Sequence, residues 1–140
     1  TNTVVEGLKT QVDFTGIEMG IDIDPELQVQ SDETLLTSIL QNLLTTSIRY
    51  RDPAKPICKL DLSIKQEGDG FKIQMTDNGL GYNEDVKHRV WDMFFKANNQ
   101  ISGSGLGLYI VKQAAEKLHG QVSMETKSME GTTILVSFPG

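Results

Sequence analysis

Three glycines alternate with other residues and lead straight into a helical pattern in the segment Ile101-Ser102-Gly103-Ser104-Gly105-Leu106-Gly107-Leu108-Tyr109-Ile110-Val111-Lys112. Glycine has no Cβ, so its backbone reaches positive φ and its N–H groups can approach a ligand closely. The first turn of a helix offers N–H groups without intrahelical partners and the positive end of the helix dipole. A glycine loop that leads into a helix is therefore a natural phosphate site. The segment predicts a nucleotide site, provided that other parts of the chain complete it.

The composition is that of one globular domain. Of the 140 residues, 38% are hydrophobic and 23% charged, and the net charge is −6. This acidity argues against nucleic acid or an anionic membrane as the main partner. A single cysteine, Cys58, excludes an internal disulfide and fits a reducing compartment. No apolar run has the length of a membrane span and no signal peptide is visible. We expect a single domain over residues 1–140, and its start at Thr1 without a methionine suggests a fragment of a longer protein.

The hydrophobic periodicity predicts alternating helices and strands. A period of two predicts strands at 17–23, 59–65, 71–75, 122–126 and 132–138. Helical spacing predicts helices at 3–12, 31–51, 84–95 and from the glycine segment to His119, with Gly120 as C-cap. Most of these strands join as hairpins, and the helices lie between the pairs. This order predicts an α+β two-layer sandwich, with a mixed, mostly antiparallel sheet and the helices on one face.

The helix predicted at 31–51 carries a polar arc beside its apolar stripe. On a wheel of 100° per residue, Asn42, Thr46 and Arg49 fall within about 60° of one another, and Tyr50 lies nearby on the apolar side. Such an arc could hold a metal ion and phosphates, with Arg49 supplying positive charge. A solvated helix edge is the alternative, and for the arc alone it is the better-supported interpretation.

A second candidate follows the strand at 71–75 directly. In Asp77-Asn78-Gly79-Leu80-Gly81, a carboxylate at a strand end could accept a hydrogen bond from an exocyclic amine such as that of adenine. The glycines would let the backbone pass close to a flat base. An ordinary Asn-Gly turn is the alternative. Nearby, Lys96 could reach a γ-phosphate, although most exposed lysines have no such role.

The glycine segment matches neither common phosphate motif. Its third glycine comes one residue too early for the dinucleotide fingerprint, and it lacks the lysine and hydroxyl residue of a P-loop. A plain glycine loop before a helix therefore stays open as an interpretation. His88 and His119 show no metal-ligand spacing and no paired base, so we interpret both as surface residues.

In this order, the pieces together resemble the ATP-binding catalytic domain of sensor histidine kinases. That family shares its Bergerat ATPase fold with gyrase, heat-shock chaperones and mismatch-repair ATPases. The resemblance covers about Phe14 to Pro139. It rests on five motifs: an N box at 40–50, a first glycine box at 77–81, an F box at 90–96, a second glycine box at 103–108 and a closing Gly-Thr-Thr at 131–133.

The resemblance implies a role for each motif. Asp77 would bind the adenine amino group, Thr132 would help through a water, and Tyr50 would line the adenine pocket. Arg49 and Lys96 would contact phosphates, and residues 96–104 would form a mobile lid. The implied nucleotide-binding residues are Asn42, Arg49, Tyr50, Asp77, Gly79, Gly81, Lys96, Gly103, Gly105, Leu106, Gly107, Leu108 and Thr132. Asn42, Thr46 and Lys96 would be catalytic, and Asn42 and Thr46 would be the metal ligands.

The implied reaction is transfer of the γ-phosphate of ATP to a histidine on a separate dimerisation domain, in two-component signal transduction. It would proceed by positioning and charge stabilisation. The implied partners are ATP and ADP, the dimerisation and phosphoacceptor helices of the same kinase, and indirectly a response regulator. Those helices are expected outside these 140 residues. The expected location is cytoplasmic, including the cytosolic part of a membrane-bound receptor, without nucleic acid or direct membrane contact.

Two departures from the family pattern leave an alternative open. The N box of the family has a second asparagine that ligates Mg²⁺, and Thr46 stands at that position. A threonine hydroxyl can ligate Mg²⁺ but is shorter, so the Mg²⁺ dependence of ATP binding is an open question. The lid is also short for the family. A degenerate nucleotide-binding or pseudokinase module that acts through protein contacts is therefore the alternative. A serine kinase of the anti-sigma-factor type, which usually keeps that asparagine, ranks lower.

Overall fold

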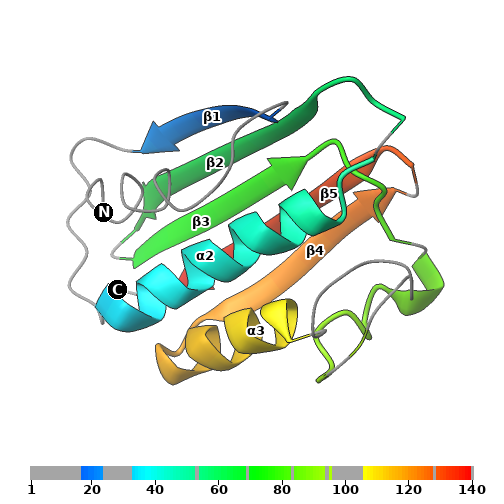
Figure 1. Ribbon diagram of the computed structural model, residues 1–140. Helices are drawn as coiled ribbons and strands as arrows, with labels where there is room; N and C mark the ends of the chain where they lie inside the picture. The colour runs from blue at the N-terminus through cyan, green and yellow to red at the C-terminus, as the bar shows by residue number, and fades with distance from the viewer. Residues whose placement is uncertain are drawn as a thin grey trace.

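The computed structural model describes residues 17–23, 33–52, 54–68, 70–82, 84–93, 95, 106–127 and 129–139. Within these residues, one five-stranded sheet carries two α-helices on one of its faces, as Figure 1 shows. The elements are β1 (Ile17–Ile23), α2 (Glu33–Arg49), β2 (Cys58–Glu67), β3 (Gly70–Asp77), α3 (Gly107–Lys117), β4 (Gln121–Lys127) and β5 (Gly131–Phe138). This is the predicted α+β two-layer sandwich.

The sheet is mixed, with strand order β1-β2-β3-β5-β4. The outer pair β1 and β2 is parallel, and the other three pairs are antiparallel. Both predicted hairpins, β2–β3 and β4–β5, are therefore confirmed. The register places Asp77, the last residue of β3, opposite Leu60 of β2 and opposite Thr132 of β5. The end of β3, the start of β5 and the end of β4 thus lie side by side at the same end of the strands.

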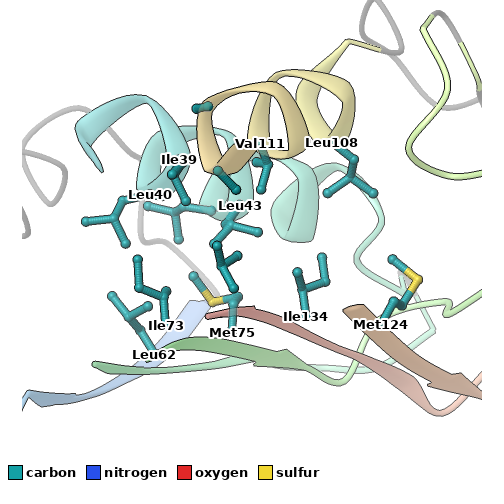
Figure 2. Close-up of a cluster of buried hydrophobic side chains, with 14 of the residues drawn as sticks. Ile39, Leu40, Leu43, Leu62, Ile73, Met75, Leu108, Val111, Met124 and Ile134 are labelled. Carbon is teal, nitrogen blue, oxygen red and sulfur yellow. The ribbon is translucent and has the colours of Figure 1, made fainter. Parts of the chain in front are cut away.

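The core lies between the helices and the sheet. Figure 2 shows side chains of α2 and α3 pointing down onto side chains that rise from the strands. Alternate residues of β2 and β3 are buried, as the period of two predicts. Burying each large aliphatic side chain contributes about 1.5–3 kcal/mol, so this layer holds both helices against the sheet. Its most completely buried members are Ile39, Leu40, Leu43, Leu44, Leu60, Ile64, Ile73, Met75, Val111 and Val136.

The prediction of a helix at 84–95 is wrong. Only a 3₁₀ turn forms, at Glu84–Val86, and further turns follow it. The backbone hydrogen bonds repeat every three residues: the N–H groups of Arg89, Asp92 and Phe95 donate to the carbonyls of Val86, Arg89 and Asp92 at 2.8, 3.0 and 3.2 Å. This spacing stacks the Arg89 guanidinium over the Phe95 ring, at 5.1 Å from its centroid. Met93 of this segment is 50% exposed.

The end of α3 differs from the prediction: the helix ends at Lys117 with Leu118 as C-cap, two residues before the predicted end at His119 with Gly120 as C-cap. His119, not Gly120, takes the left-handed conformation, with φ of 62°. The Gly120 N–H donates to the Ala115 carbonyl at 2.8 Å and closes the helix. Glycine is nevertheless required at 120, because a Cβ there would lie 2.7 Å from the carbonyl oxygen of Ser137 on β5. The predicted helix at 3–12 lies outside the described residues, as do the first two residues of the helix predicted at 31–51.

Candidate functional site

Asp77 lies at the end of the central strand β3, on the face of the sheet that the helices cover. It follows Ile73 and Met75 at intervals of two, and both of these are buried under the helices (Figure 2). Its Oδ1 accepts a hydrogen bond from the Gly79 N–H at 2.9 Å. A carboxylate accepts about four hydrogen bonds, so this bond leaves capacity for a ligand. Asp77 is therefore placed to receive a donor group at the end of β3.

Burial raises the pKa of Asp77 above its ordinary value of 3.8. Backbone hydrogen bonds from Gly79 and Thr132, the Ser47 hydroxyl and the positive charge of Lys55 lower the pKa again in part. Ser47 Oγ is buried, and among the described residues it has no hydrogen bond of good geometry. We therefore interpret its effect on Asp77 as that of a nearby dipole rather than of a formed hydrogen bond.

The turn after Asp77 is fixed on both sides, unlike an ordinary exposed Asn-Gly turn. The Asn78 side chain accepts from the Lys59 N–H at 2.8 Å and donates to the Ile57 carbonyl at 3.1 Å. The Leu80 N–H donates at 2.8 Å to the carbonyl of Tyr50, just beyond the end of α2. A Cβ on Gly79 would lie 2.5 Å from that same carbonyl oxygen. Only glycine fits there without a shift of the backbone.

The turn between β4 and β5 packs onto the same place. Gly131, with φ of 136°, lies so close that a Cβ would overlap the Asp77 carbonyl oxygen. Gly81, with φ of 67°, approaches the carbonyl of Lys127 in the same way. The Met129 N–H donates to the Leu80 carbonyl at 2.6 Å. Two positive-φ glycines thus bring the backbone of two segments, the turn after β3 and the turn between β4 and β5, together beside Asp77.

The polar arc of α2 lies against the start of α3. A Cβ on Gly107 would lie 2.6 Å from Thr46 Oγ1 and 3.7 Å from Asn42 Oδ1. The Asn42 amide nitrogen donates to the Ser38 carbonyl at 2.7 Å, so Oδ1 is the atom turned toward Gly107. Leu106, the N-cap, provides no side-chain hydrogen bond to the first turn of α3. The structure therefore brings Asn42, Thr46 and the start of α3 together.

These two oxygens fit a magnesium ion. Mg²⁺ prefers oxygen ligands and is usually held by one or two protein groups together with phosphate and water. Asn42 Oδ1 and Thr46 Oγ1 both lie beside Gly107, and a Cβ there would be 2.6 Å from Thr46 Oγ1. Within the described part of the chain, no group of three His, Cys, Asp or Glu side chains is placed to hold a metal. Asn42 and Thr46 are thus the candidate metal ligands that the structure describes.

Two tyrosines pack against each other near Asp77, and one of them was missed by sequence reasoning. The rings of Tyr50 and Tyr82 are 5.0 Å apart and tilted by 44°. Tyr82 is 5% exposed, and burial, followed by Tyr50 and Asp77, raises its pKa. Its N–H donates at 2.8 Å to the Thr126 hydroxyl, which is 3.0 Å from the Thr132 hydroxyl. The position of Tyr82 directly after the first glycine box was the available signal.

The remaining predicted residues are distributed as follows. Arg49 is exposed at the end of α2, and Leu108 is buried in the first turn of α3. An open hollow of about 590 Å³ is lined by Asp77 and Thr132 together with Lys87 and Glu130; Asn42 and Thr46 are not among its lining residues. Lys96, Gly103 and Gly105 lie outside the described residues, as does the predicted lid. No described helix has the length and apolar character needed to cross a membrane.

Known proteins resemble this chain over nearly its whole length. A family model described as histidine kinase-, DNA gyrase B-, and HSP90-like ATPase matches residues 31–140. The sensor-like histidine kinase SenX3 of Mycobacterium tuberculosis is 32% identical over 135 residues, which are 94% of this chain and 32% of SenX3. The heme sensor protein HssS of Staphylococcus saprophyticus is 27% identical over 98% of this chain and 30% of its own length. The chain thus spans about a third of these curated relatives.

Solved structures share the fold. The mycobacterial sensor histidine kinase MprB matches with a TM-score of 0.82 at 26% identity, covering 99% of this chain and 92% of that structure. The catalytic domain of the histidine kinase ThkA matches with a TM-score of 0.81 at 21% identity, covering 99% and 91%. These matches confirm the predicted fold class.

Proposed function

The chain belongs to the family of histidine kinase-, DNA gyrase B- and HSP90-like ATPases, and from this premise we propose that it is the ATP-binding catalytic domain of a sensor histidine kinase. The observation that supports this most strongly is the surroundings of Asp77. A partly buried carboxylate, with accepting capacity left over, is surrounded by close glycine contacts at the end of a rigid strand. The relatives named as histidine kinases point to the same activity.

The base would bind at the Asp77 end of the site. Asp77 would accept a hydrogen bond from the exocyclic amine of adenine, because adenine has a donor where guanine has a carbonyl oxygen. Gly79 and Gly81 let the backbone after Asp77 pack closely against the Tyr50 and Lys127 carbonyls, which would fix the Asp77 end of the base site. Tyr50 would line the base, and Thr132, whose hydroxyl faces Thr126, would act through a water.

The triphosphate would bind at the start of α3. The N–H groups of the first turn and the helix dipole favour negative charge at Leu106, Gly107 and Leu108. Arg49 and Lys96 would add positive charge, and Gly103 and Gly105 would let the preceding loop follow the phosphates. Asn42 and Thr46 would hold Mg²⁺, which when bound neutralises phosphate charge.

The residues of this chain would position ATP rather than react with it. We propose that the γ-phosphate passes to a histidine on dimerisation and phosphoacceptor helices outside these 140 residues, with a response regulator as the later acceptor. Alignment of the transferred phosphoryl group with the incoming histidine and stabilisation of its charge would account for the catalysis. The proposed location is cytoplasmic.

The test combines binding and transfer. A fluorescent ATP analogue is titrated into the domain with and without Mg²⁺, and unlabelled ATP, ADP and GTP are used as competitors. We expect saturable binding that ATP and ADP displace and GTP does not. Transfer is then measured with γ-labelled ATP in the full-length protein, where acid-labile, base-stable label is expected on a histidine. Absence of saturable adenine-nucleotide binding would refute the proposal, and binding without transfer would favour the pseudokinase alternative.

A further inference from the structure

Lys55 connects two of the segments that surround Asp77. It lies in the connection between α2 and β2, and its side chain is partly buried. Its Nζ donates to the Asn78 carbonyl at 2.6 Å and to the Met129 carbonyl at 3.0 Å. Asn78 directly follows Asp77, and Met129 is in the turn between β4 and β5. A single ammonium group therefore joins the α2–β2 connection to both of the turns at this sheet edge.

The same ammonium group acts on the Asp77 carboxylate. Three titratable groups of the packed segments interact with Asp77: Lys55, Cys58 at the start of β2, and Tyr82. Of these, Lys55 is the cation, and its charge lowers the pKa of Asp77 against the effect of burial. Two carbonyl partners hold the ammonium in place, so it is a fixed charge rather than a mobile surface lysine.

We propose that Lys55 is a positioning residue for base recognition, which holds the turn after β3 in place and supplies a fixed positive charge near the Asp77 carboxylate that would accept a hydrogen bond from the amine of adenine. This inference rests on the proposed function, because it assumes that Asp77 binds the base. Lys55 itself does not contact the nucleotide. Its effect comes through the Asn78 carbonyl, one residue from Asp77, and through its charge.

Three substitutions separate the charge of Lys55 from its hydrogen bonds. Lys55→Arg keeps both, Lys55→Gln keeps donors but removes the charge, and Lys55→Met removes both. Lys117→Met is the matched control. Lys117 ends α3 shortly before β4 begins, whereas Asp77 lies near the other end of β4, so the control removes a lysine from the opposite end of the sheet.

The first measurement needs no nucleotide. The pKa of Asp77 is followed by carbon NMR of its carboxyl group in each variant, at pH values where circular dichroism shows a folded protein. We expect a higher pKa in Lys55→Gln and Lys55→Met, and the wild-type value in Lys55→Arg and Lys117→Met. An unchanged pKa in both charge-removing variants would overturn the inference while leaving the proposed function intact.

The second measurement is the affinity for a fluorescent ATP analogue as a function of pH. We expect about threefold to tenfold weaker binding near neutral pH in Lys55→Gln and Lys55→Met, as for one lost polar interaction. The acid limb of the binding curve should move to higher pH by the NMR shift of Asp77, and Lys55→Arg should restore it. If affinity falls equally at all pH values and the acid limb does not move, Lys55 has only a structural role, and the inference is overturned. If the wild-type protein binds no adenine nucleotide, the proposed function fails instead.

Discussion

Replacing Asp77 by asparagine should weaken nucleotide binding without weakening the fold. The substitution keeps the shape of the side chain, and an amide oxygen can still accept the Gly79 N–H, which lies 2.9 Å from Oδ1. The other side-chain atom becomes an NH₂ group, so a donor faces the amine of the base. A lost hydrogen bond to a charged group costs about 1.5–3 kcal/mol, which is about 10-fold to 150-fold in dissociation constant.

The stability of the fold should change in the opposite direction. Burial raises the pKa of Asp77 above 3.8 in the folded protein, so the folded state holds this proton more tightly than the unfolded state. The contribution of Asp77 to stability is then fully present below pH 3.8 and is lost as pH rises through the raised pKa. At neutral pH the ionised carboxylate is therefore a cost, which asparagine does not carry. We expect Asp77→Asn to have an equal or higher midpoint of thermal unfolding at pH 7.

The assay measures both quantities on the same samples. Dissociation constants come from titration with a fluorescent ATP analogue, and unfolding midpoints come from circular dichroism at pH 7. Asp61→Asn is the matched control, since Asp61 is an exposed carboxylate on β2 and its loss changes the net charge equally. A dissociation constant within twofold of the wild-type value would refute the assignment of Asp77 to the base. Weaker binding together with a lower midpoint would mean that the substitution damaged the fold.

Three further substitutions test the remaining contacts. Thr46→Asn should increase the ratio of affinities measured with and without Mg²⁺, and no increase would mean that residue 46 is not at a metal position. Gly107→Ala places a Cβ 2.6 Å from Thr46 Oγ1, so it should cost about 1–3 kcal/mol by overpacking and weaken phosphate binding. Urea denaturation measures the loss of stability. The affinity for ATP relative to that for AMP, each measured by competition, gives the loss of phosphate binding. Gly131→Ala combines an unfavourable φ with overlap on the Asp77 carbonyl, so it should destabilise by at least about 1–3 kcal/mol in urea; an unchanged midpoint would contradict the close packing.

The layers of the fold could be predicted because their signals are local. Alternation of apolar residues along β2 and β3, with a tight glycine turn between them, specifies a hairpin without reference to the rest of the chain. The same holds for the apolar stripe of α2. The prediction for residues 84–95 was wrong because their apolar spacing fits a helix, whereas their backbone forms successive three-residue turns. A sequence pattern does not distinguish these when the deciding contacts are tertiary.

The residues of the candidate site also fall into those that a local motif predicts and those that only the fold reveals. Asp77 and its glycines are adjacent in sequence, so their order was visible as a motif. Lys55 is separated from its partners Asn78 and Met129 by 23 and 74 positions, and no local pattern connects them. Ser47 lies near Asp77 only because α2 packs across the end of β3. Such residues become visible only when the fold brings distant segments together.

The C-terminal half of α2 links the two ends of the candidate site. Thr46 and Ser47 are adjacent, and successive helical residues point about 100° apart. Thr46 accordingly faces Gly107 at the start of α3, and Ser47 acts on Asp77 at the edge of the sheet. Both are buried, beside the fully buried Leu43 and Leu44. The distance between the proposed base end and phosphate end of the site is therefore set by one turn of α2, which the hydrophobic core holds in place. Because of this, a relative shift of the two ends requires movement of α3 or of β3 against α2.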